Sequence, residues 1–96
     1  MKEVQITYNE AINAELIACL TTHGISTYTK IPHVFGVGTH SDPHMGSHVW
    51  PGENNMLFIV AEDEAVAKIM DCVRQLKKKK LKEGIKAFLI PVEEVI

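Results

Sequence analysis

The sequence predicts an α+β domain in which two helices cover one face of a four-stranded antiparallel sheet. Strand-like runs, alternating or rich in β-branched residues, occur four times, and two longer segments repeat apolar residues at three- and four-residue steps. These segments follow one another in the order of the ferredoxin-like βαββαβ sandwich. We expect residues 1–96 to form a single domain with a long loop at about residues 36–54.

The first half of the chain supplies a strand, a helix and a second strand. Residues 3–8, EVQITY, alternate apolar and polar side chains, which predicts a strand with one buried face. Asn9 can cap a helix over about residues 10–23, and Gly24 offers a left-handed end to it. Residues 25–31, ISTYTKI, are rich in β-branched and aromatic residues and predict the second strand.

The second half supplies a strand, a helix and the last strand. Residues 55–61, NMLFIVA, form a continuous apolar run that is typical of a central strand. Asp63 can cap a helix over about residues 64–80, because apolar residues then recur on one face. Residues 85–92 predict the fourth strand, with Pro91 at its end or on an edge.

The predicted architecture leaves one face of the sheet without a cover from its own chain. We expect Tyr8, Tyr28 and apolar residues of the third strand to be partly exposed there. An uncovered apolar face is typical of an interface, which predicts a homo-oligomer.

Charge and hydropathy exclude several classes of partner. The net charge of −2 gives no field that would attract nucleic acid, and the apolar run at 56–61 is too short to cross a membrane. The first residues lack the apolar region of a signal peptide. We therefore expect a cytoplasmic protein that binds no nucleic acid and does not insert into a membrane.

The two cysteines could form a disulfide or remain as thiols. Cys19 and Cys72 each fall within a helical apolar pattern. Because two cysteines without a secretion signal rarely form a structural disulfide, we predict buried thiols.

The long loop holds three of the five histidines. His40, His44 and His48 are spaced as on one helical face, but Pro43 and Gly46 exclude a helix there. Loops longer than about 12–15 residues tend to be functional or disordered.

Neutral imidazoles with nearby carboxylates suit a divalent transition metal such as zinc, nickel or copper. The candidate ligands are His40, His44 and His48, followed by Asp42, Glu53 and His33. The alternative is structural, because loop histidines can also donate caps, stack on Trp50 or remain solvated.

No motif indicates catalysis. The chain holds no nucleophile motif, no phosphate-binding P-loop and no complete dinucleotide fingerprint. We predict a binding protein with no catalytic residue, and not an enzyme.

Three segments carry a family resemblance over nearly the whole chain. HGISTYTKI at 23–31, GVG at 36–38 and GIKAFLIPVEEVI at 84–96 resemble the nitrogen-regulatory PII superfamily. The resemblance implies a homotrimer whose long T-loop contacts a partner and whose subunit clefts bind adenine nucleotides and other small effectors.

The chain also departs from that family. KKKKLKEG at 77–84 stands where the family has a glycine-rich phosphate-binding segment. A nucleotide is therefore not expected, and Gly36, Gly38, Lys80 and Lys82 are the candidates for binding another effector.

These observations predict a PII-like homotrimeric regulatory protein that responds to a metal through the histidine-rich loop. Its partner would be a membrane transporter or a regulatory protein. HVWPGEN at 48–54 is similar to a segment of CutA-type divalent-cation tolerance proteins, which provides the first alternative. The second is a sensor of an anionic small molecule that uses the lysines at 78–82; the other interpretation of these lysines is a solvated helix end.

Overall fold

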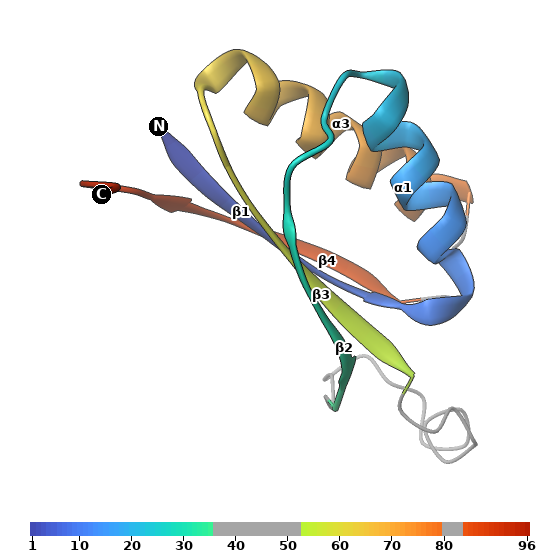
Figure 1. Ribbon diagram of the computed structural model, residues 1–96. Coiled ribbons are helices and arrows are strands. Elements are labelled where there is room, and N and C mark those ends of the chain that lie inside the picture. Colours follow the sequence, from blue (N-terminus) through green and yellow to red (C-terminus); the bar gives the residue numbers. More distant parts are fainter. Residues whose placement is uncertain (36–52, 80–83) are drawn as a thin grey trace.

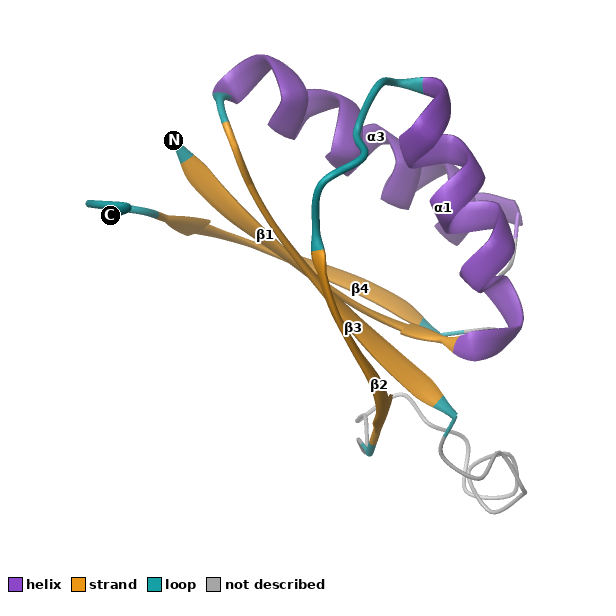
Figure 2. Ribbon diagram, in the orientation of Figure 1, coloured by secondary structure: helices purple, strands orange, loops and turns teal. Residues whose placement is uncertain are grey.

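A four-stranded antiparallel sheet with two helices on one face makes up the fold (Figures 1 and 2). The computed structural model describes residues 1–35, 53–79 and 84–96. Its elements are β1 (Lys2–Asn9), a 3₁₀ turn (Glu10–Ile12), α1 (Asn13–Thr22), β2 (Thr29–Val34), β3 (Asn54–Ala61), α3 (Asp63–Lys79) and β4 (Ile85–Pro91). The predicted α+β, ferredoxin-like fold is confirmed.

The strands lie in the order β2-β3-β1-β4, so β1 and β3 are central and β2 and β4 form the edges. In the register, Ile6 of β1 stands between Leu57 of β3 and Ala87 of β4. The prediction of a central third strand is confirmed, and so is the placing of Pro91 at the end of an edge strand.

The hydrophobic core lies between the helices and the sheet. Side chains alternate between the two faces of a strand, and one set of each central strand is buried under α1 and α3. The buried apolar residues are Val4, Ile6, Tyr8, Ile12, Leu16, Leu20, Leu57, Ile59, Val66, Ile69, Cys72, Val73, Leu76 and Ile85.

The predicted helix over about residues 10–23 is a 3₁₀ turn at Glu10–Ile12, capped by Asn9 as expected, followed by α1 at Asn13–Thr22. The Asn9 side chain accepts a hydrogen bond of 2.8 Å from the Ala11 amide, which satisfies one of the free N–H groups at the helix start. Gly24 has a φ of +79°, a left-handed conformation that glycine adopts without steric cost.

The second strand differs from its prediction. It covers Thr29–Val34 and not residues 25–31, because the chain first crosses from the helix layer to the sheet. The Ile25 amide donates to the Leu20 carbonyl at 2.9 Å, and its apolar side chain packs against the core just after the end of α1. Pro32 is tolerated within β2 because that strand lies at an edge.

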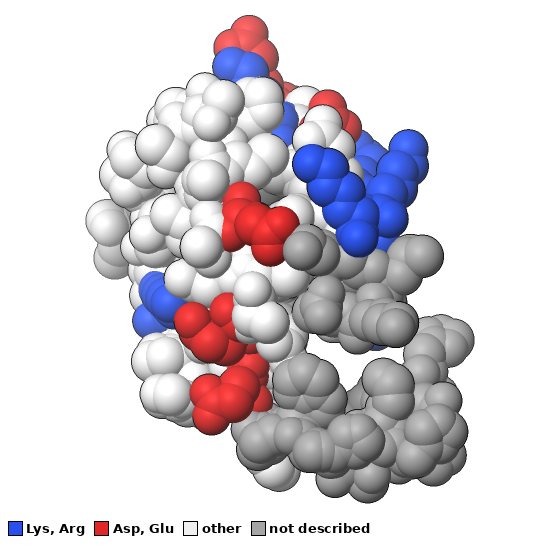
Figure 3. Space-filling model, turned by 90° about the vertical axis from the view of Figure 1, so that its right-hand side faces the viewer, with Lys and Arg blue, Asp and Glu red and all other residues white. Residues whose placement is uncertain are grey.

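The second helix, α3, begins at Asp63, one residue before the start predicted from the sequence. The Asp63 carboxylate accepts a hydrogen bond of 3.2 Å from Lys2, so it links the helix start to β1. The last turn of α3 carries three lysines, at positions 77–79. In Figure 3 the largest group of Lys and Arg side chains lies at the upper right of this face, and smaller basic groups at the top and lower left lie beside acidic side chains.

The face of the sheet opposite the helices is uncovered (Figure 2). Ile31, Val60 and Phe88 are 40%, 46% and 50% exposed. The prediction for Tyr8 is wrong: its register with Asn55 and Ile85 places it on the helix side, where it is 1% exposed. Among the described residues, no helix combines the length and apolar character needed to span a membrane.

The prediction of two buried thiols is wrong as well. Cys19 of α1 and Cys72 of α3 form a disulfide, with their Cα atoms 6.0 Å apart. The helical pattern places each cysteine on the apolar face of its helix, but it does not show that the two faces meet at these residues.

Candidate functional site

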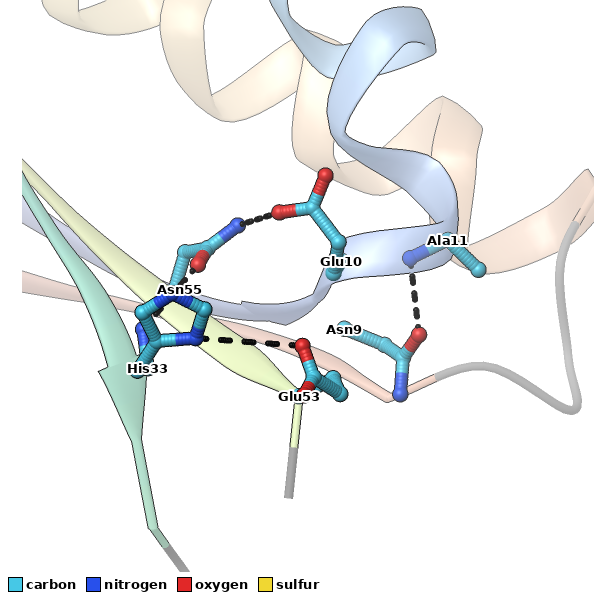
Figure 4. A network of polar contacts seen from close by, with 6 residues as sticks. All are labelled: Asn9, Glu10, Ala11, His33, Glu53 and Asn55. Carbon is cyan, nitrogen blue, oxygen red and sulfur yellow. Dashed lines mark hydrogen bonds and ion pairs between the residues drawn. The ribbon is translucent and has the colours of Figure 1, made fainter. Parts of the chain in front are cut away.

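The polar features of the described chain that suit ligand recognition lie at the two ends of β2. One is a network at its end, where the chain leaves for residues 36–52 and returns at Glu53 (Figure 4). The other is an open hollow at its beginning, on the uncovered face of the sheet.

Asn55 is the centre of the network. Its side chain, 2% exposed, donates to the Glu10 carboxylate at 2.5 Å and accepts from the His33 backbone amide at 3.4 Å. The Glu10 amide in turn donates to the Glu53 carbonyl at 2.7 Å. Three segments that are distant in the sequence are therefore held together by one buried amide, whose polar atoms are satisfied.

His33 has an unusual backbone conformation at this point. Its φ of 58° lies in the left-handed region, and β2 shifts its register between Ile31 and Val34. The His33 ring is exposed, with Nδ1 3.8 Å from the Glu53 carboxylate (Figure 4). A non-glycine residue in this region persists only where its surroundings fix it, which the bond to Asn55 does here.

Asn13 connects the same region to the start of α1. Its side-chain oxygen accepts hydrogen bonds from the Tyr8 hydroxyl at 2.5 Å and from the Lys30 ammonium at 3.2 Å. Burial raises the pKa of the Tyr8 hydroxyl, and a hydrogen bond to Asn55 opposes this in part. The phenol is thus neutral at physiological pH and acts as a hydrogen-bond donor.

The hollow lies on the uncovered face and has a volume of about 500 Å³. It is lined by Glu3, Thr27, Tyr28, Thr29, Phe58 and Val60. In the register, Thr29 stands beside Phe58 and Glu3 beside Val60, so aromatic, hydroxyl and carboxylate groups share one surface. These groups can stack on a planar ring and exchange hydrogen bonds with it.

The structure brings together two of the predicted site residues, His33 and Glu53. Both side chains are more than half exposed. The remaining predicted residues lie outside the described part of the chain; they are Gly36, Gly38, His40, Asp42, His44, His48, Lys80 and Lys82.

Sequence reasoning missed Asn55 and Glu10; it placed Tyr28 and apolar residues of the third strand on the exposed face but assigned them no ligand. Asn55 begins an apolar strand, where a buried amide carries no visible pattern. Thr27, Tyr28 and Thr29 have the side chains of strand formers, although two of them precede the strand. The signal that could have found them is their position between a helix end and an edge strand.

Comparisons with known proteins place this geometry in a family. The chain matches the family described as nitrogen regulatory protein P-II over residues 1–96. No match was found among curated proteins.

Solved structures share the fold. CPII, a PII-like protein of Thiomonas intermedia bound to ADP, AMP and bicarbonate, is 17% identical, with a TM-score of 0.67 and coverage of 99% of this chain and 94% of that chain. A PII-like signalling protein of Thermus thermophilus is 20% identical, with a TM-score of 0.62 and coverage of 92% and 81%. The apo form of CPII is 15% identical, with a TM-score of 0.63 and coverage of 95% and 89%.

These structures correct the predicted cofactor. The sequence predicts a divalent transition metal and no nucleotide, whereas the similar CPII structures hold ADP and AMP. The prediction against a nucleotide is based on the lysine run that begins at residue 77, and it is not supported for a protein of this fold. From the match over its whole length and the shared architecture, the chain belongs to the nitrogen regulatory protein P-II family.

Proposed function

We propose that this protein is a regulatory protein that assembles as a homotrimer and senses an adenine nucleotide between its subunits. The observation that carries the proposal is the open hollow on the uncovered sheet face, which we expect a neighbouring subunit to close. Membership of the P-II family supports a signalling role.

The uncovered face supports assembly. It presents Ile31, Val60 and Phe88 to solvent, and apolar side chains in such number on one face favour burial against another copy. A closed symmetric assembly would cover this face in every subunit. A neighbouring subunit would then also close the hollow.

The lining of the hollow suits an adenine ring. Tyr28, 40% exposed, offers an aromatic face for stacking, and Thr27 and Thr29 offer hydroxyls for the ring nitrogens. The Glu3 carboxylate can accept a hydrogen bond from the exocyclic amine, although it also accepts one from Gln5 at 3.3 Å. The ADP and AMP of CPII, a protein of the same fold, support this ligand class.

The other end of β2 supports a partner-binding role for residues 36–52. The network joins His33, before this segment, to Asn55 of β3, and joins Glu53, after it, to Glu10 of the 3₁₀ turn. A ligand in the hollow contacts the same edge strand that leads into the segment. We propose that ligand binding is transmitted along β2 to the segment, and from there to a transporter or regulatory protein.

Isothermal titration calorimetry with ADP tests the ligand and its place. Removal of the stacking ring in Tyr28→Ala should weaken binding about five- to 150-fold, since stacking on a base contributes about 1–3 kcal/mol. Thr29→Val should weaken it less, through loss of one hydroxyl. Thr22→Val is the matched control, because Thr22 lies on α1 and bonds to the Ala18 carbonyl.

Unchanged ADP affinity in both hollow variants would place the nucleotide elsewhere. Absence of binding by the wild-type protein would reject the ligand class. The same titration in bicarbonate buffer tests for a second effector, since CPII is found with ADP and bicarbonate together.

A further inference from the structure

The disulfide between α1 and α3 has a histidine beside it. Cys19 lies on α1 and His23 caps the end of that helix four residues later, where its amide donates to the Cys19 carbonyl; Cys72 of α3 is bonded to Cys19. The two sulfur atoms and an imidazole nitrogen lie within 4.8 Å of one another. These three residues belong neither to the network around Asn55 nor to the lining of the hollow.

The two cysteines differ in exposure. Cys72 is 0% exposed, whereas Cys19 is only partly buried and His23 is exposed at the helix end. Cys19 is therefore the more accessible of the two cysteines to an incoming thiol. A disulfide with only a structural role requires neither a partly exposed cysteine such as Cys19 nor a neighbouring imidazole such as that of His23.

We infer that Cys19, Cys72 and His23 form a thiol–disulfide exchange site whose substrate is a dithiol reductant. Attack by one thiolate of the reductant on Cys19 forms a mixed disulfide and releases Cys72 as a thiolate. The second thiol of the reductant then displaces Cys19. The protein gains two electrons and two protons, and the dithiol leaves as a disulfide.

His23 is a positioning residue for this exchange. Its ring lies beside the sulfur that leaves, where an imidazole stabilises a thiolate and can supply its proton. Among the described residues the cluster combines both cysteines with a single histidine, so the contribution of the ring can be isolated by one substitution.

The first test measures reduction of the folded, oxidised chain by dithiothreitol and by glutathione. Samples are quenched with iodoacetamide and the products are weighed by mass spectrometry. We expect reduction without denaturant, and a glutathione adduct on Cys19. Reduction that requires denaturant, or an adduct found only on Cys72, would overturn the proposal.

The second test compares side-chain variants, each checked for native circular dichroism. His23→Gln should slow reduction several-fold, and His23→Lys should restore part of the rate because it returns a cationic proton donor. Lys68→Gln, which removes an exposed positive charge from α3 outside the cluster, should react as the wild type does. Equal rates for the wild type and His23→Gln would reject the role of His23, and failure of the disulfide to re-form in a glutathione redox buffer would reject exchange altogether.

Discussion

The side-chain amide of Asn55 donates to the carboxylate of Glu10 at 2.5 Å, across a sequence separation of 45 residues. The same amide group holds the backbone of His33 through its oxygen. One buried side chain thus joins the beginning of β3, the start of the first helix and the end of the edge strand.

Substitution Asn55→Ala should destabilise the fold. It removes the hydrogen bonds that Asn55 makes with the exposed Glu10 carboxylate and with the His33 amide, at a cost of about 0.5–1.5 kcal/mol per hydrogen bond in the free energy of unfolding. Urea denaturation followed by circular dichroism measures this change. Gln5→Ala is the control, because that amide lies on the uncovered side of β1; equal losses in the two variants would argue against the network.

The order of the elements could be predicted because each depends on local chemistry. The Asn9 cap, the Gly24 helix end and the alternation in β1 are each visible within a few residues. The start of β2 could not be predicted in this way, because this edge strand begins only where it can pair with β3. The first paired residue of β2 is Thr29. Ile25 packs against the core although it lies outside β2. A local pattern does not distinguish such an apolar residue from one that belongs to a strand.

The candidate site was harder to predict than the fold. Histidines draw attention to residues 36–52, while the polar centre that the structure shows is an asparagine within an apolar run. The pairing of Cys19 with Cys72 depends on how two helices meet, which neither helix encodes alone.

Reduction of the disulfide should lower stability substantially. The bond joins residues separated by 53 positions, and closing a loop of that size stabilises the folded state by about 4 kcal/mol in the chain-entropy account. Urea midpoints of the oxidised and reduced protein give the difference. Coincident midpoints would show that the crosslink contributes nothing to stability.

A charge on the uncovered sheet face should disrupt the assembly. Phe88→Asp places a carboxylate where we propose that another copy packs, so the variant should elute as a smaller species with native circular dichroism. Ala67→Glu, on the exposed side of α3, should leave the oligomer unchanged. Light scattering on a size-exclusion column measures both, and a Phe88→Asp variant of unchanged mass would argue against this face as the interface.

The Tyr8 hydroxyl should titrate above its usual pKa of 10.0, because burial disfavours the phenolate. A raised pKa favours the neutral form in the folded state. The resulting stability is therefore present below pH 10 and is lost as the pH rises through the folded-state pKa. Tyr28→Phe leaves Tyr8 as the remaining tyrosine, and its ultraviolet absorbance then reports this titration.

The unfolded protein is the reference for that titration. In urea, the midpoint of the Tyr28→Phe variant should return to about 10. A folded-state midpoint at or below the unfolded one would contradict the buried, hydrogen-bonded phenol.

Native mass spectrometry of the wild-type protein with ADP tests the central claim most directly, because it reports assembly and ligand in one spectrum. The account predicts a species of three chain masses that carries up to one ADP per chain. A species of one chain mass that retains no ADP across the accessible concentrations of protein and nucleotide would contradict it.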